Sequence, residues 1–201
     1  MKYYAIRQID GVPIRKILTD WNECKSIVSG KRAEYKSFKT EQDALDYVNE
    51  YQEEEKEEDV LANPNNHIYY VDGSCKDDDK IGWGFVYIKN NQVITTMCGG
   101  VKPVEGYTTR NITGELESAK MAVRHALANN LKEIYIINDY QGISSYITGA
   151  WKADKQESKD YLAWMKKATA DIKVNFVKIK GHSNNKYNDM VDGLAKMGNY
   201  L

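Results

Sequence analysis

A run of acidic residues divides this chain into two unequal parts. Residues 51–66 read YQEEEKEEDVLANPNN, with six acidic residues against one lysine and an Asn/Pro cluster at the end. Like charges repel one another and Asn and Pro interrupt regular structure, so the run is typical of a linker. Alternatively, its first glutamates extend the helix expected before it. The sequence predicts a small domain at 1–50, an acidic linker at 51–66 and a larger domain at 67–201.

Composition and charge exclude several classes of protein. The three cysteines have no C-x-x-C spacing, which argues against a disulfide framework or a zinc site and favours a reducing compartment. No apolar run approaches the ~18–20 residues that a membrane span needs, and the N-terminus does not lead into a secretory segment. We therefore expect a cytoplasmic protein with no membrane partner. Basic residues outnumber acidic ones nine to eight over 1–50 and 18 to 15 over 67–201, which permits a polyanionic partner.

The first part has the pattern of a small α+β domain. The stretches KYYAIRQ, RKILT and EYKSF alternate like strands, and the first two are joined by a turn at DGVP. A Thr-Asp pair begins a helix at WNECKSIVS, which Gly30 would end. A capping box begins a second helix at EQDALDYVNEY, with Ala44, Leu45 and Val48 on one face. The result is a unit of three strands and two helices.

The second part combines an antiparallel meander with strand–helix alternation. Strands are expected at 67–75, 81–89, 92–101, 133–138 and 173–180, and helices at about 112–129, 140–149, 157–170 and 187–197. The first three strands are joined by tight turns, one of which contains Asp77, Asp78 and Asp79 as solvated turn residues. The later strands are separated by helices, as in βαβ units. We expect an α/β fold with a mixed five-stranded sheet and flanking helices.

Four acidic residues lie where these strands and helices begin or end. Asp72 lies on the first strand, Glu115 at the start of a helix, Asp139 directly after the strand EIYIIN, and Asp192 within the last helix. Each has an ordinary interpretation on its own, as a turn residue, a helix-dipole partner or a cap. In a sheet with this order, however, the strand and helix ends could converge.

Converging carboxylates would need cations. Clustered carboxylates repel and raise one another's pKa, and a fold tolerates them mainly when cations bind them. Oxygen ligands select hard ions such as Mg²⁺ or Mn²⁺. Two such ions about 4 Å apart would activate a water molecule and stabilise the leaving oxygen of a phosphodiester. The pattern indicates hydrolysis of a phosphodiester.

Residues 67–201 resemble a type 1 ribonuclease H over their whole length. The resemblance depends on YVDGSC with GWGFV, RNITGELESA, IINDYQGI and GHSNNKYNDMVDGLAK, which occur in that order. It implies that Asp72, Glu115, Asp139 and Asp192 are the catalytic residues and bind two Mg²⁺ ions, for which Mn²⁺ can substitute. It also implies endonucleolytic cleavage of the RNA strand of an RNA–DNA hybrid, leaving 5′-phosphate and 3′-hydroxyl ends.

The resemblance also suggests residues for product release and substrate contact. His182 matches a family loop histidine that assists product release; without the motif it would be read as a surface histidine. Asn111 matches an asparagine that reaches the minor groove, where 2′-hydroxyls mark RNA. Gly73, Ser74 and Cys75 are expected against the RNA strand, with Gly73 allowing close approach. Ile112 and Arg110 depart from the commonest family pattern at this groove contact.

Residues 1–50 resemble the small hybrid-binding, viroplasmin-like domain that precedes some type 1 ribonucleases H. The matching stretches are YYAIR, WNECK and YKSFKT. The resemblance implies that Tyr4, Trp21, Tyr35 and Lys36 face the duplex, the rings against DNA sugars and the lysine on phosphate. Aromatic residues in so small a domain are otherwise more often part of the core.

Two other functions stay open at this point. One is a binding protein that keeps the fold but does not cleave, and the other is a different two-metal nuclease of the same fold. Both alternatives are less favoured because all four acidic residues, the loop histidine and the binding domain are present. The expected partner is an RNA–DNA hybrid duplex, with no obligate protein partner, and the chain is expected to be a monomer.

Overall fold

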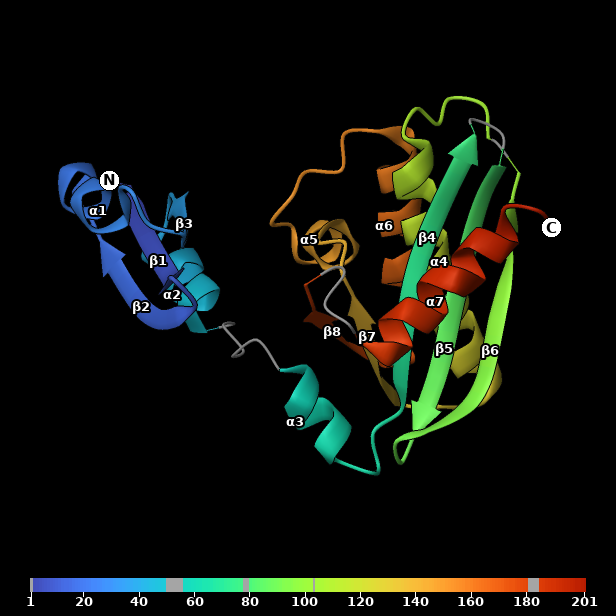
Figure 1. Ribbon diagram of the computed structural model, residues 1–201. Coiled ribbons are helices and arrows are strands. Elements are labelled where there is room, and N and C mark those ends of the chain that lie inside the picture. Colours follow the sequence, from blue (N-terminus) through green and yellow to red (C-terminus); the bar gives the residue numbers. More distant parts are fainter. Residues whose placement is uncertain (1, 50–55, 78–79, 103, 181–184) are drawn as a thin grey trace. The chain divides into compact units, whose positions relative to one another are not determined.

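The chain folds into two compact units, Met1–Glu54 and Glu55–Leu201 (Figure 1). The computed structural model describes residues 2–49, 56–77, 80–102, 104–180 and 185–201. The elements of the first unit are β1 (Tyr3–Ile9), β2 (Val12–Leu18), α1 (Trp21–Val28), β3 (Ala33–Phe38) and α2 (Glu41–Asn49). Its three strands form an antiparallel sheet in the order β2-β1-β3.

Local turn and cap chemistry accounts for the element ends in the first unit. Asp10 (φ 51°) and Gly11 (φ 82°) form a two-residue turn, and β2 therefore begins earlier than the sequence pattern predicts. The Oδ1 atom of Asp20 accepts a hydrogen bond from the backbone N–H of Asn22 and caps α1. The prediction for Leu45 is wrong: Ala44 and Val48 are buried, but Leu45 is 38% exposed, because it lies one residue round the helix from the buried stripe.

Among its described residues, the second unit has ten elements. These are α3 (Glu57–Ala62), β4 (Ile68–Asp77), β5 (Lys80–Lys89), β6 (Gln92–Val101), α4 (Arg110–Ala128), β7 (Glu133–Asn138), α5 (Gly142–Thr148), α6 (Gln156–Ala168), β8 (Lys173–Lys178) and α7 (Lys186–Gly198). The sheet order is β6-β5-β4-β7-β8. β4, β5 and β6 pair antiparallel, whereas β7 is parallel to both β4 and β8. The mixed five-stranded sheet with flanking helices is confirmed.

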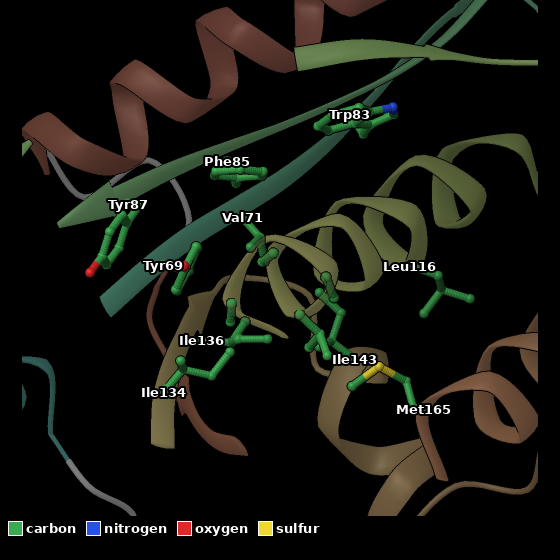
Figure 2. Packing of buried hydrophobic residues seen from close by; sticks show 14 of the residues in the cluster. Tyr69, Val71, Trp83, Phe85, Tyr87, Leu116, Ile134, Ile136, Ile143 and Met165 are labelled. Atoms are coloured by element: carbon green, nitrogen blue, oxygen red, sulfur yellow. The ribbon is translucent and has the colours of Figure 1, made fainter. Parts of the chain in front are cut away.

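Helices cover both faces of this sheet. α4 and α6 lie on one face and α7 crosses the other (Figure 1). Because side chains alternate along a strand, Tyr69 and Val71 of β4 and Phe85 of β5 point toward α4 (Figure 2). Tyr70 and its alternating neighbours pack instead against α7. β4 is thus buried from both sides along its first half.

Helix α3 lies inside the segment expected to be a linker. Its Val60 is 3% exposed and packs in the core beneath α7. Its Glu57 accepts hydrogen bonds from the hydroxyl of Tyr70 and from the side-chain amide of Asn185, the residue that caps α7. The acidic composition made it hard to recognise that Val60 is buried and that Glu57 is a half-buried hydrogen-bond acceptor. Residues 56–62 therefore belong structurally to the second unit.

None of the helices in the described residues has the length and apolar character needed to cross a membrane.

Helix α3 should stabilise the second unit measurably. A chain that begins at residue 55 is expected to unfold with a free energy about 2–4 kcal/mol larger than a chain that begins at residue 64. Burial of Val60 and the hydrogen bonds of Glu57 are the physical reason. Urea denaturation followed by circular dichroism measures the difference, and equal midpoints would show that α3 is only a tether.

Candidate active site

Two of the expected acidic residues meet because of strand register. β4 and β7 run parallel, with Ile68 opposite Tyr135 and Tyr70 opposite Ile137. Continuing this register by two residues brings Asp72 beside Asp139, the first residue after β7. The carboxyl ends of parallel strands are a common place for sites in α/β proteins, and here the register itself brings two carboxylates together.

Glu115 joins them because α4 lies unusually close to β4. A Cβ atom on Gly73 would lie 2.0 Å from the backbone nitrogen of Glu115, so only glycine permits this contact. The space beside Gly73 is occupied by α4, which is a different reason for a glycine here from the close approach of an RNA strand. The helix begins at Arg110, so Glu115 lies in its second turn rather than at its start.

The three carboxylates form a compact group of oxygen ligands. Asp72, Glu115 and Asp139 each offer an oxygen atom within 4.8 Å of the others. The N–H of Gly73 donates a 2.8 Å hydrogen bond to Oδ1 of Asp72 and fixes its orientation. Oε2 of Glu115 is buried and has no hydrogen-bond partner among the described residues. An all-oxygen set with an unpartnered buried atom fits a hard divalent cation.

Electrostatic repulsion within the group is strong. Burial and the charge of Asp139, with a further contribution from Asp192, raise the pKa of Asp72 to about 7. Burial, followed by the charges of Asp72 and Asp139, raises the pKa of Glu115 well above its ordinary value. Both shifts express the cost of holding like charges together away from water. A divalent cation would offset that cost.

Asp192 lies near this group but is not one of the three. Its charge contributes to the raised pKa of Asp72. Its own carboxylate accepts a 2.6 Å hydrogen bond from Lys196, one turn further along α7. The ion pair uses Oδ2 of Asp192, and a carboxylate has a second oxygen through which it can bind a cation.

The remaining expected site residues of the second unit have mixed outcomes. Ser74 and Cys75 follow Gly73 on β4 and are partly exposed; the hydroxyl of Ser74 accepts a 3.0 Å hydrogen bond from Asn199. Asn111 lies in the first turn of α4. The expectation for His182 falls on residues 181–184, outside the described part of the chain.

The expected binding residues of the first unit surround one cavity. Tyr4, Trp21, Tyr35 and Lys36 line a hollow of about 390 Å³, together with Lys2 and Ser37. The Trp21 ring lies 5.3 Å from that of Tyr4 and 6.1 Å from that of Tyr35, and it is 40% exposed. These rings form a surface rather than a core. Sequence reasoning missed Lys2, although strand alternation places it on the same face as Tyr4.

Two families match the two units of this chain. Residues 64–200 match the family described as RNase H, and residues 2–48 match the family described as Ribonuclease H1 N-terminal domain. A ribonuclease H from Ehrlichia ruminantium is 30% identical over 142 residues, which are 66% of this chain and 93% of that protein. One from Marinobacter nauticus is 32% identical over 141 residues, which are 65% of this chain and 92% of the relative.

Solved structures share the fold. RNase H1 from Halobacterium salinarum superposes with a TM-score of 0.57 at 14% identity, covering 67% of this chain and 97% of the other. LC11-RNase H1, solved in complex with an RNA/DNA hybrid, has a TM-score of 0.54 at 16% identity and covers 66% and 98%. The mixed sheet, with carboxylates where β4, β7 and α4 meet, defines a nuclease of the ribonuclease H class. The chain belongs to the ribonuclease H family. Its first unit corresponds to the N-terminal domain of type 1 members. The resemblance expected from the sequence is confirmed.

Replacing one crowded carboxylate should stabilise the metal-free protein. Glu115→Gln removes a buried charge that Asp72 and Asp139 repel, and we expect unfolding free energy to rise by about 1–2 kcal/mol. For a domain of this size, each kcal/mol of unfolding free energy corresponds to a shift of about 2–4 °C in Tm. Mg²⁺ should raise the Tm of the wild type and not of this variant. Thermal unfolding with Mg²⁺ and with chelator tests both points.

The exposed Glu105→Gln serves as the matched control, because it makes the same chemical change at an exposed side chain outside the carboxylate group. A drop in metal-free Tm for Glu115→Gln, or an unchanged response to Mg²⁺, would contradict a cation site at these carboxylates.

Proposed function

We propose that this protein hydrolyses the RNA strand of RNA–DNA hybrids endonucleolytically. The observation that carries the proposal is the convergence of Asp72, Glu115 and Asp139 beside the middle of β4 and the carboxyl end of β7, in a member of the ribonuclease H family. A relative of the same fold has been solved with an RNA/DNA hybrid, which supports the choice of substrate.

The chemistry follows from what these residues can hold. Two Mg²⁺ ions, or Mn²⁺ in their place, would activate a water molecule and stabilise the leaving oxygen. Asp72, Glu115, Asp139 and Asp192 would hold the cations. The water oxygen forms a bond to phosphorus, the bond from phosphorus to the 3′ oxygen breaks, and that oxygen takes a proton. The products carry 5′-phosphate and 3′-hydroxyl ends.

Substrate contacts and product release complete the proposal. Asn111, in the first turn of α4, reads the minor groove, where 2′-hydroxyls distinguish RNA from DNA. Gly73 directly follows Asp72 on β4, and its backbone, with Ser74 and Cys75, lines the path of the RNA strand. His182 assists departure of the product.

The first unit supplies additional hybrid affinity. Its aromatic cavity, with Lys2 and Lys36 on the rim, presents ring faces and positive charge to a duplex backbone. We propose functional domains at 1–50 and 67–201, with an acidic segment at 51–66 that does not itself bind nucleic acid and whose helix α3 packs against the second domain. Tethering a binding unit to a cutting unit raises the effective concentration of hybrid at the active site.

Asp139→Asn should abolish cleavage and leave hybrid binding intact, because it removes a metal ligand but not the binding surface. Cleavage of a labelled hybrid, beside single-stranded RNA, double-stranded RNA and double-stranded DNA, measures the first effect and fluorescence anisotropy the second. A loss of at least a thousandfold in rate is expected for a ligand whose charge the reaction needs.

Glu133→Gln, at an ion pair on the surface, should cut at the wild-type rate. Full activity of Asp139→Asn would overturn the assignment of the carboxylates. Wild-type protein that cuts no hybrid with either Mg²⁺ or Mn²⁺ would favour a binding protein, and cutting of double-stranded DNA would favour a different two-metal nuclease.

Trp21→Ala should weaken hybrid binding by the first unit. The ring is central to the cavity, and its removal is expected to cost about 1–1.4 kcal/mol, or a five- to tenfold rise in Kd. Fluorescence anisotropy in the Asp139→Asn background measures Kd without cleavage. The exposed Val12→Ala on β2, outside the cavity, is the control. Equal Kd values for Trp21→Ala and the control would place hybrid binding elsewhere.

A further inference from the structure

Helix α4 begins without a side-chain cap of its own. Its N-cap residue, Thr109, makes no capping hydrogen bond, and its first turn contains no acidic residue. The hydroxyl of Thr109 instead accepts a hydrogen bond from Nζ of Lys155. The first N–H groups of a helix need partners, and an anion there also interacts favourably with the helix dipole. For this 19-residue helix, such a partner comes from another element.

The partner is Glu157, in the first turn of α6. Its Oε1 atom accepts hydrogen bonds from the backbone N–H of Thr109 at 2.9 Å and of Thr108 at 3.3 Å. The hydroxyl of Thr108 lies 3.5 Å from the same oxygen. Tyr107 donates a 2.9 Å hydrogen bond to Asp160, one turn further along α6. The segment that leads into α4 is thus attached to α6 at successive residues.

Glu157 places a carboxylate in a buried position. Its side chain is buried, with only 3% of the residue exposed, and its Oε2 atom has no hydrogen-bond partner among the described residues. That side chain borders a cavity of about 90 Å³, which Thr113 and Leu116 also line. Burial acts to raise the pKa of Glu157, but hydrogen bonds from its own backbone, Thr109 and Thr108 outweigh it, and the pKa is lowered. The backbone N–H groups of Thr108 and Thr109 thus help to keep this buried carboxylate ionised, and the carboxylate in turn holds the backbone at these two residues.

The second turn of α4 and the segment just before its first turn are held in place by different contacts. Glu115 is fixed through the backbone contact at Gly73, whereas residues 108 and 109 are fixed through Glu157. Arg110 and Asn111 follow those residues directly. Loss of Glu157 should therefore disturb the first turn of α4 and leave the carboxylate group in place.

We propose that Glu157 is a positioning residue for hybrid binding, which acts by anchoring the backbone that leads directly into Arg110 and Asn111. This role rests on the proposed function. Under this proposal, the contact of Glu157 with residues 108 and 109 governs substrate affinity, whereas the contact of Gly73 with Glu115 governs metal binding.

The test compares Glu157→Gln and Glu157→Ala in the full chain, with steady-state cleavage of a short hybrid. Glu157→Ala is expected to raise KM about tenfold, with kcat and the half-saturating Mg²⁺ concentration within about twofold of wild type. Glu157→Gln keeps one acceptor oxygen and should raise KM by only about threefold. Asp154→Asn, an exposed residue just before α6 whose charge changes in the same way, should leave KM unchanged.

Amide hydrogen exchange separates anchoring from general destabilisation. In Glu157→Ala, exchange over 107–111 should accelerate at least tenfold, while the amides of β4 and β7 remain protected. Unchanged exchange over 107–111, an unchanged KM, or a fall in kcat at constant KM would each overturn the proposal; if Glu157→Ala does not fold, the KM and exchange of Glu157→Gln decide. A wild type that cuts no hybrid refutes the proposed function instead, and the exchange result still reports on the anchor.

Discussion

The backbone contact between Gly73 and the second turn of α4 sets the geometry of the larger unit. No side chain separates strand from helix at this point. The backbone of β4 and the backbone of α4 are therefore in direct contact. That closeness brings Glu115 to the strand position beside Asp72. The core between α4 and the sheet, with Tyr69, Val71 and Phe85, then fills the wider part of the same interface (Figure 2).

The site is held together by packing, against its own electrostatics. Three carboxylates within 4.8 Å of one another repel, and burial together with this repulsion raises the pKa of Asp72 and of Glu115. Register fixes Asp72 and Asp139 through the β4–β7 ladder, and close packing fixes Glu115. Stability is given up locally in order to preorganise a charged site, as is common where activity and stability compete.

Much of this architecture could be predicted from sequence because its signals are local. Strand alternation, caps such as Asp20 and turns such as Asn90-Asn91, both with positive φ, depend on neighbours in the chain. The reason for a glycine at 73 could not be predicted, since it lies in a helix that begins 37 positions later. Helix α3 could not be predicted to belong to the second unit either, because its packing depends on one buried valine among acidic residues. The role of Glu157 could not be predicted, because the sequence shows only an ordinary acidic residue in the first turn of a helix and not its hydrogen-bond partners.

The same reasoning explains why an acidic residue in a helix's first turn is hard to interpret. Glu157 satisfies the usual preference for negative charge at the start of α6, yet its hydrogen bonds go to the segment before α4. One carboxylate thereby contacts the starts of two helices. Helix α4 is thus anchored at two separate points, at Gly73 through its second turn and at Glu157 ahead of its first turn.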